Sequence, residues 1–253
     1  DAIVIGTGMS GGWAMKELTE KGLTVLALER GNNKIHIKDY DTANVNTWEN
    51  PLRGNLSHEF VTNNPILVRS GVVDGFTTKM FAADKVHPYI QDKPFDWIRG
   101  YHVGGRSLMW GRWVQRWGEA DFEANAKEGV DTDWPIRYND LAPWYSYVEK
   151  FVGIAGNKDG LPQIPDGEFL PPFDMTAMEK LVKEKIETTF PGRNLIISRT
   201  ANITQPTAEH MALGRGKCQA RNLCSRGCPF GAYFSTQSAT LPAAQKTGKL
   251  TLQ

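Results

Sequence analysis

Residues 1–31 read DAIVIGTGMSGGWAMKELTEKGLTVLALERG, and this stretch decides the fold class. An apolar run predicts a first strand over Ala2–Ile5, and a glycine-rich turn and an amphipathic helix follow it. A second apolar run predicts another strand from Thr24 to Leu28. Strand, glycine turn, helix and strand in this order predict an α/β unit of the Rossmann type.

The glycines of this stretch predict a dinucleotide site. Gly6, Gly8 and Gly11 form the pattern G-x-G-x-x-G. The first allows a tight turn, the second lets the backbone approach a pyrophosphate, and the third lets the helix pack on the strand. Glu29 ends the second strand, where an acid accepts hydrogen bonds from ribose hydroxyls. NAD and FAD share this pattern, and a glycine-rich turn that binds nothing is the alternative. The neighbouring residues Met9, Ser10, Gly12 and Arg30 are also predicted to contact the cofactor.

A second glycine-rich segment, WIRGYHVGGRSLMWGRW, spans residues 97–113. Gly104 and Gly105 would bring the backbone close to a flat ligand, and Ser107 offers a hydroxyl for a hydrogen bond. An ordinary turn in a tryptophan-rich core is the alternative interpretation. The same loop carries Arg106, Met109, Trp110 and Gly111.

All three cysteines, Cys218, Cys224 and Cys228, lie in GKCQARNLCSRGCPFG. A disulfide would leave one thiol over, and structural zinc sites generally use C-x-x-C pairs, which are absent. CSRGCP reproduces the C-x₃-C-P ending of bacterial ferredoxins, and three thiolates suit a [3Fe–4S] cluster. Zinc and unligated redox-sensing thiols stay open, and His210 is predicted to be a surface histidine.

The composition excludes several classes of protein. The 253 residues carry a net charge of +1 with scattered basic residues, so no nucleic-acid partner is expected. No apolar stretch is long enough to cross a bilayer. The chain opens directly in an apolar strand without a visible leader, and GKLTLQ at its end predicts a turn entering a strand. We therefore expect the front part of a longer protein.

The two glycine segments together resemble the flavin-contacting segments of the glucose–methanol–choline (GMC) oxidoreductase family. Its second segment usually reads G-G-S-S-x-x-N, and Arg106 and Trp110 replace a serine and the asparagine here. DWPIRYNDLAPWYSYVEKFVGIAG (residues 133–156) is similar to a stretch of the bacterial branch. The resemblance implies FAD rather than NAD, held by the glycine turn, Glu29 and the 104–111 loop. No histidine stands in SLMW, so we expect non-covalent FAD.

The spacing C-x₅-C-x₃-C, followed by PFGAYFSTQSATLPAA, resembles bacterial GMC enzymes that oxidise sugars and carry a [3Fe–4S] cluster. The phrases around Trp97–Arg112 and Cys224–Ala244 look most like glucoside 3-dehydrogenases, which oxidise the C3 hydroxyl of a pyranoside to a ketone. The resemblance implies electron transfer from FAD through the cluster to a c-type cytochrome or a quinone. It also implies a sugar or glycoside substrate, a small companion subunit with an export signal, and a periplasmic location.

The family's catalytic base is a histidine paired with a histidine or asparagine, and we expect this pair beyond Gln253. The five histidines of the chain match no such motif. Two other functions stay open: a non-catalytic flavin and iron–sulfur electron-transfer subunit, and a zinc-stabilised oxidase that uses oxygen.

The predicted organisation has five segments. They are the start of the FAD-binding unit (1–31), a lid or cap extension (32–96), a flavin-contacting segment (97–130), the start of a substrate or cap domain (131–215), and a cluster loop returning to the FAD domain (216–253). A helix is predicted between Thr176 and Pro191, with a Thr176–Glu179 capping box. Its apolar face is interpreted as core packing, and NLIISRT (194–200) as a strand; the face consists of Met178, Leu181, Val182 and Ile186.

Overall fold

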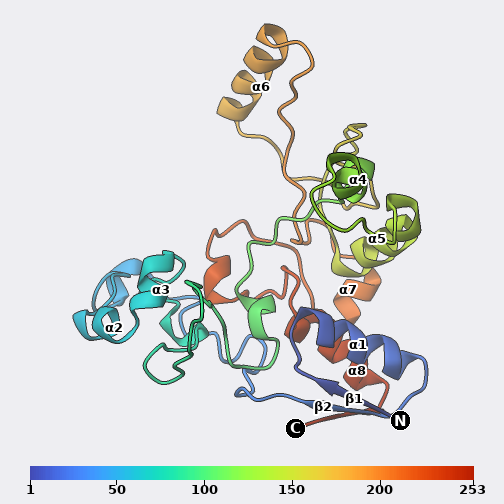
Figure 1. Cartoon of the computed structure of the whole chain (residues 1–253). Coiled ribbons are helices and arrows are strands. Elements are labelled where there is room, and N and C mark those ends of the chain that lie inside the picture. Colours follow the sequence, from blue (N-terminus) through green and yellow to red (C-terminus); the bar gives the residue numbers. More distant parts are fainter. The chain divides into compact units, whose positions relative to one another are not determined.

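The computed structural model describes residues 1–253 as two compact units. Unit 1 comprises residues 1–111, 219–231 and 235–253, and unit 2 comprises residues 112–218 and 232–234. The helices and strands, drawn in Figure 1, are β1 (Ala2–Ile5), α1 (Met9–Glu20), β2 (Val25–Leu28), α2 (His58–Asn63), α3 (Pro65–Ser70), α4 (Glu119–Glu128), α5 (Tyr138–Val152), α6 (Ala177–Thr189), α7 (Ala208–Ala212), α8 (Leu241–Lys246) and β3 (Leu250–Leu252). Short helical turns are η1 (Thr47–Glu49), η2 (Thr78–Met80), η3 (Gly105–Leu108), η4 (Cys224–Arg226) and the π-helical η5 (Thr236–Thr240).

Unit 1 contains a parallel sheet in the order β1-β2-β3. Ala2 pairs with Val25, and Val25 pairs with Leu250 on its other side. The predicted strand, helix and second strand are present, with β2 starting one residue later than expected. Because α1 connects two parallel neighbouring strands, the predicted α/β class is confirmed.

Helices α1 and α8 cover one face of this sheet (Figure 1). The opposite face leaves Ile3 and Ile5 exposed at 66% and 85%. The covered face holds the apolar core of the unit, which fixes the position of the turn between β1 and α1. This core consists of Val4, Met15, Val25, Ala27, Val103, Leu241 and Ala244.

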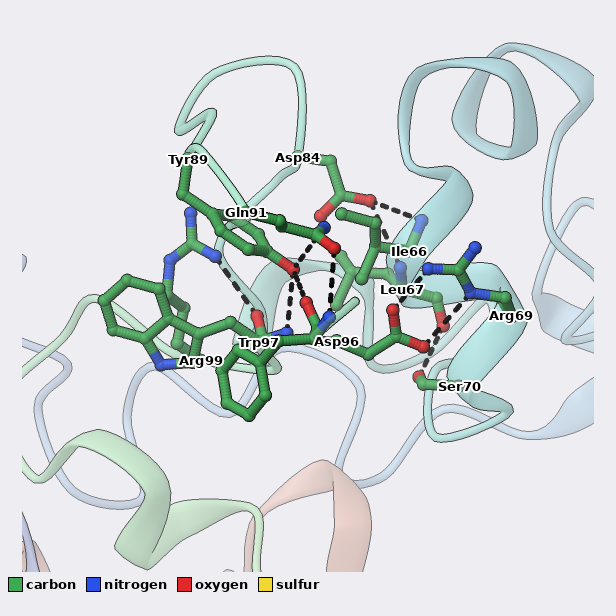
Figure 2. A network of polar contacts seen from close by, with 11 residues as sticks. Ile66, Leu67, Arg69, Ser70, Asp84, Tyr89, Gln91, Asp96, Trp97 and Arg99 are labelled. Carbon is green, nitrogen blue, oxygen red and sulfur yellow. Dashed lines mark hydrogen bonds and ion pairs between the residues drawn. The ribbon is translucent and has the colours of Figure 1, made fainter. Parts of the chain in front are cut away.

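The segment between the glycine regions contains only the short helices α2 and α3 and two helical turns. It is held by polar contacts around α3, shown in Figure 2. Oδ2 of Asp84 accepts hydrogen bonds from the backbone N–H groups of Ile66 and Leu67, at 2.8 and 3.1 Å, and so satisfies the start of α3. Arg69, in the last turn of α3, pairs with Asp96. These contacts tie the chain after residue 84 to the helix before it.

Arg99 organises the end of the same segment. Its side chain is 5% exposed and lies near the rings of Trp97 and Tyr89, at 4.6 and 5.0 Å from their centroids (Figure 2). Its Nε donates to the hydroxyl of Tyr101 over 2.7 Å, and its guanidinium also donates to the carbonyl oxygen of His87. The cation is therefore paired with aromatic faces and backbone oxygens rather than with a carboxylate.

Unit 2 is organised around buried charges. Arg116 and Glu149 form a two-pronged ion pair, with Nε–Oε1 at 2.8 Å and Nη2–Oε2 at 2.7 Å. Both side chains are less than a tenth exposed. The hydrogen bonds that Arg116 donates to Glu149 outweigh the opposing effect of burial and raise the pKa of Arg116. The backbone N–H of Glu168 also donates to Glu149, so the pair links α5 to the following loop.

Three sequence predictions for unit 2 need correction or confirmation. Helix α6 forms, and Thr176 accepts a hydrogen bond from the N–H of Glu179, which confirms the capping box. Its apolar face is not core: Met178 is 68% exposed, and no residue of α6 is buried. Residues 194–200 form no strand, because their backbone makes only isolated bridges, both at Thr200.

His210 was predicted to lie at the surface, and this is wrong. It is 1% exposed, its Nε2 lies 3.1 Å from the carbonyl oxygen of Lys150, and its Nδ1 caps the turn at Thr207. Burial, followed by the charge of Arg215, lowers its pKa. The histidine is thus part of the packing of unit 2.

No helix in the described residues combines the length and apolar character needed to cross a bilayer.

Candidate functional site

The turn between β1 and α1 has the geometry that its glycines predict. Gly6 has a φ of +85°, a conformation that favours glycine. A Cβ added at Gly11 would lie 1.9 Å from the carbonyl oxygen of Gly6, so only glycine lets α1 approach the turn this closely. A Cβ added at Gly8 would meet no atom within 4 Å. Gly8 therefore faces open space, whereas Gly11 is required by the protein's own packing.

Thr7 joins this turn to the other predicted contacts. Its hydroxyl donates to Oε2 of Glu29 over 2.6 Å and accepts a hydrogen bond from the N–H of Gly104 over 3.0 Å. The N–H of Thr7 also donates to Oε2 of Glu29, at 3.0 Å. The side chain is fully buried. One hydroxyl thus holds together the glycine turn, the end of β2 and the second glycine segment.

Glu29 is held in its ionised form. Its partial burial acts to raise the pKa, but hydrogen bonds from Thr7 and from the backbone of Gly31 and Arg30 outweigh burial, and the pKa is lowered. The N–H of Gly31 donates to Oε1 over 3.0 Å. A carboxylate has about four lone-pair positions, and the donors from Thr7, Gly31 and Arg30 fix its orientation at the end of β2.

The second glycine segment lies directly against the first. Gly104 has a φ of +86° and opens η3, and a Cβ on Gly105 would lie 3.6 Å from the Cα of Gly8. Ser107 is fully buried, and its hydroxyl donates to the carbonyl of Gly104 over 2.6 Å. The same oxygen accepts from the N–H of Thr236 at 3.0 Å. Ser107 therefore braces the loop instead of pointing toward an open site.

The other predicted contact residues occupy different surroundings. Gly12 is buried against η5, where a Cβ would lie 2.6 Å from the hydroxyl of Thr240. The guanidinium of Arg30 lies 3.9 Å from the ring centroid of Tyr101, and Arg106 donates to the carbonyl of Ile98. The remaining ones line the turn and the loop and are half-buried or exposed: Met9, Ser10, Met109, Trp110 and Gly111.

These observations fit a dinucleotide. The backbone at Gly8 faces open space at the start of α1, so a ligand can approach it closely. The first turn of a helix offers N–H groups without intrahelical acceptors and the positive end of the helix dipole, both of which suit a pyrophosphate. Glu29 supplies an acceptor for ribose hydroxyls at the end of β2. The hydrogen-bonding groups and the shape of the turn therefore both suit a dinucleotide.

The three cysteines are distributed over the two units. Cys218 belongs to unit 2, where its N–H donates to the carbonyl of Ile203 over 2.7 Å. Cys224 and Cys228 belong to unit 1, on and just after η4. None forms a disulfide, and each is half-buried. No group of three or more His, Cys, Asp and Glu side chains among residues 1–253 is arranged to hold a metal ion.

The two cysteines of unit 1 lie in a loop that is pinned to residues 40–76. Gly227 has a φ of +90°, and a Cβ there would lie 2.4 Å from the ring of Tyr40. Burial, and then the charge of Cys228, raise the pKa of Tyr40. The guanidinium of Arg226 lies 3.4 Å from the ring centroid of Phe76. The loop is therefore held in place by its packing against Tyr40 and Phe76 in unit 1.

Two parts of the site were missed by sequence reasoning. Thr7 lies inside the glycine pattern at a position that the pattern leaves unspecified. Segment 235–240 is polar, which favours an exposed loop, yet it is fully buried beside both glycine segments. Its run of small hydroxyl side chains before the apolar start of α8 is the only signal that could have indicated close packing.

Comparison with known proteins gives three informative relatives. The chain is 26% identical over 251 residues to the fructose dehydrogenase large subunit of Gluconobacter japonicus, covering 99% of the chain and 44% of the relative. It is 27% identical over 281 aligned positions to the gluconate 2-dehydrogenase flavoprotein of Pantoea cypripedii, covering 100% and 43%. It is 25% identical over 242 residues to the paromamine 6'-oxidase of Streptomyces fradiae, covering 92% and 36%.

The chain spans less than half the length of each of these curated relatives. No family model matches it. The relatives confirm the resemblance to the GMC oxidoreductases that the glycine and cysteine motifs indicated, at about 26% identity.

Proposed function

We propose that this chain is the FAD-binding part of a GMC-type oxidoreductase that oxidises a CH–OH group of a sugar or related alcohol. The observation that carries the proposal is the open space at Gly8, in a turn that also holds the Thr7–Glu29 pair and lies against Gly105. Relatives named as fructose and gluconate dehydrogenases support the choice of a flavin and of a sugar-like alcohol.

Each residue of the site has a proposed task toward the cofactor. Gly8 leaves room for the pyrophosphate, the start of α1 offers it N–H groups, and Glu29 accepts from a ribose hydroxyl. Thr7 keeps Glu29 and the backbone of Gly104 in place. When bound, FAD would supply the acceptor for the hydride removed from the alcohol carbon. The base that takes the hydroxyl proton is proposed to lie beyond Gln253.

A finer proposal concerns the substrate and the path of the electrons. We infer oxidation at C3 of a pyranoside, a [3Fe–4S] cluster on Cys218, Cys224 and Cys228, and a c-type cytochrome or quinone as acceptor. The support is the C-x₅-C-x₃-C-P spacing and its resemblance to glucoside 3-dehydrogenases. A companion subunit with an export signal and a periplasmic location belong to the same proposal. One relative is named a large subunit, which is in line with a partner.

Cofactor titration of the purified full-length protein tests the central proposal. The protein is stripped of bound cofactor, and FAD and NAD are titrated separately while flavin fluorescence and thermal stability are followed. We expect saturable binding of FAD and a raised Tm, with no comparable effect of NAD. Saturable NAD binding without FAD binding would refute the proposal. Turnover with glucosides, fructose and gluconate, followed by product analysis, then identifies the carbon that is oxidised.

An oxidase is the second candidate, because paromamine 6'-oxidase is among the relatives. Oxygen uptake and hydrogen peroxide formation with the same substrates separate the two functions. A dehydrogenase reduces a cytochrome or quinone analogue much faster than it consumes oxygen. Dominant peroxide formation together with bound zinc would favour the oxidase.

A further inference from the structure

The π-helical turn η5 is buried along its whole length although nearly all of its side chains are polar. π-helical turns are rare and are frequent at functional sites. This turn contacts both glycine segments. The hydroxyl of Thr236 donates to the carbonyl of Gly8 over 3.1 Å, and its N–H donates to Ser107. The segment thus forms a third wall beside the proposed cofactor site.

Gln237, the second residue of η5, has an amide with one end paired and one end unpaired. The side chain is 4% exposed, and its Nε2 donates to the carbonyl of Lys34. This bond sets the orientation of the amide, because the flipped amide would place two acceptors against each other. Oε1 then lies 3.3 Å from the position that a Cβ on Gly104 would occupy. It has no hydrogen-bond partner within the protein. A buried carbonyl in this position is costly unless something donates to it.

We propose that Oε1 of Gln237 accepts a hydrogen bond from an N–H or O–H group of the bound flavin dinucleotide, which makes Gln237 a cofactor-binding residue. The inference rests on the proposed function and adds a contact that the glycine motifs do not contain. It is supported by the proximity of the amide to Gly104 and by the burial of the unpaired oxygen.

Thr240, on the same turn, supplies a matched comparison. Its hydroxyl is also buried and also lacks a partner. However, it faces α1, where a Cβ on Gly12 would lie 2.6 Å away, so the close contact of η5 with α1 leaves no space for a ligand there. One turn therefore carries two unpaired oxygens: that of Gln237 lies beside Gly104 of the second glycine segment, and that of Thr240 is packed against Gly12 within α1.

The test compares Gln237→Leu with Thr240→Val in the full-length protein. FAD dissociation constants are measured by flavin fluorescence, and Tm is measured with and without FAD. The loss of one neutral hydrogen bond to FAD is expected to weaken its binding about tenfold in Gln237→Leu. Without FAD, the Tm of this variant should change little, because the loss of the hydrogen bond to Lys34 is offset by the removal of an unsatisfied buried oxygen. Thr240→Val should bind FAD within about twofold of the wild type.

Three outcomes separate the possibilities. Unchanged FAD affinity in Gln237→Leu overturns the inference. A lower Tm without FAD and an unchanged dissociation constant would mean that Gln237 only supports the backbone at Lys34, and this also overturns it. If Gln237→Leu does not fold, Gln237→Met replaces it with the same expectations, because its unbranched side chain has a similar length. A folded wild type that binds no FAD would instead refute the proposed function itself.

Discussion

The hydroxyl of Thr7 donates to Oε2 of Glu29 over 2.6 Å, and the N–H of the same threonine donates to the same oxygen. The threonine is fully buried, and the glutamate is half-buried at the end of β2. Because Thr7 also accepts from Gly104, a residue 97 positions later in the chain, the pair couples the two glycine segments. The acid of the site is positioned by a residue within the glycine turn.

Replacing this hydroxyl should loosen the whole site. Thr7→Val keeps the shape but leaves the N–H of Gly104 and one bond of Glu29 unsatisfied, which should cost about 1–3 kcal/mol of unfolding free energy. Urea denaturation measures this loss. Thr7→Ser retains the hydroxyl and should recover most of the stability. A larger loss in Thr7→Ser than in Thr7→Val would show that the methyl group, rather than the hydroxyl, matters.

Glu29 should make stability depend on pH in one direction. Its pKa is lowered in the folded protein, so its ionised form stabilises the fold above the usual value of 4.5, and this contribution disappears as the pH falls through the folded pKa. The difference in unfolding free energy between wild type and Glu29→Gln should therefore be constant near neutral pH and shrink below pH 4.5. Denaturation curves from neutral to acidic pH check this, and a difference that grows on acidification would contradict it.

The same added methyl group should weaken FAD binding at Gly8 and lower the stability of the fold at Gly11. Gly8→Ala meets open space, so it should cost at most about 1 kcal/mol of stability, as at other helix N-caps, while it weakens FAD binding at least tenfold. Gly8→Val should abolish FAD retention. Gly11→Ala would clash with the backbone of Gly6 and should cost more than about 3 kcal/mol. Thermal unfolding and FAD titration separate the effects; stoichiometric FAD in Gly8→Val would refute the site.

The Arg116–Glu149 pair should be the most sensitive polar contact of unit 2. Arg116→Met leaves a buried carboxylate without its cation and should cost about 3–5 kcal/mol. The double variant with Glu149→Met should recover much of this loss. The exposed pair Arg137–Asp133 provides the control, because Arg137→Met should change stability by less than about 1 kcal/mol. Similar costs for both arginines in urea denaturation would show that burial does not decide the effect.

Cys224→Ser tests the proposed iron–sulfur cluster. The full-length wild type, purified without oxygen, should contain iron and sulfide, and its oxidised form should give an S = 1/2 EPR signal that fades on reduction. The variant should lose this signal and the iron while it keeps FAD, because Cys224 lies outside the glycine segments. Zinc in place of iron, or a variant without iron that reduces a cytochrome at the full rate, would contradict the electron-transfer proposal.

The features that could be predicted from the sequence depend on neighbouring residues. The β1–α1–β2 unit follows from two apolar runs and a glycine turn, and the start of α6 follows from Thr176 and Glu179, which lie three residues apart. Strand periodicity, the steric freedom of glycine and helix capping act over a few residues, so a short stretch contains all the information needed. The identity of Gly6 and Gly11 as structural positions belongs to this group.

Tertiary structure alone decided which polar groups were buried and which apolar groups were exposed. Thr236 bonds Gly8 across 228 positions, and Ser107 bonds Thr236 across 129, so no local pattern indicates that the polar turn η5 is interior. The apolar face of α6 shows the converse, because amphipathic periodicity specifies a face but not what covers it. The division of Cys218 from Cys224 between two units is likewise a property of the folded chain. Burial is settled by contacts between distant segments, whereas the sequence pattern records only the preferences of each segment by itself.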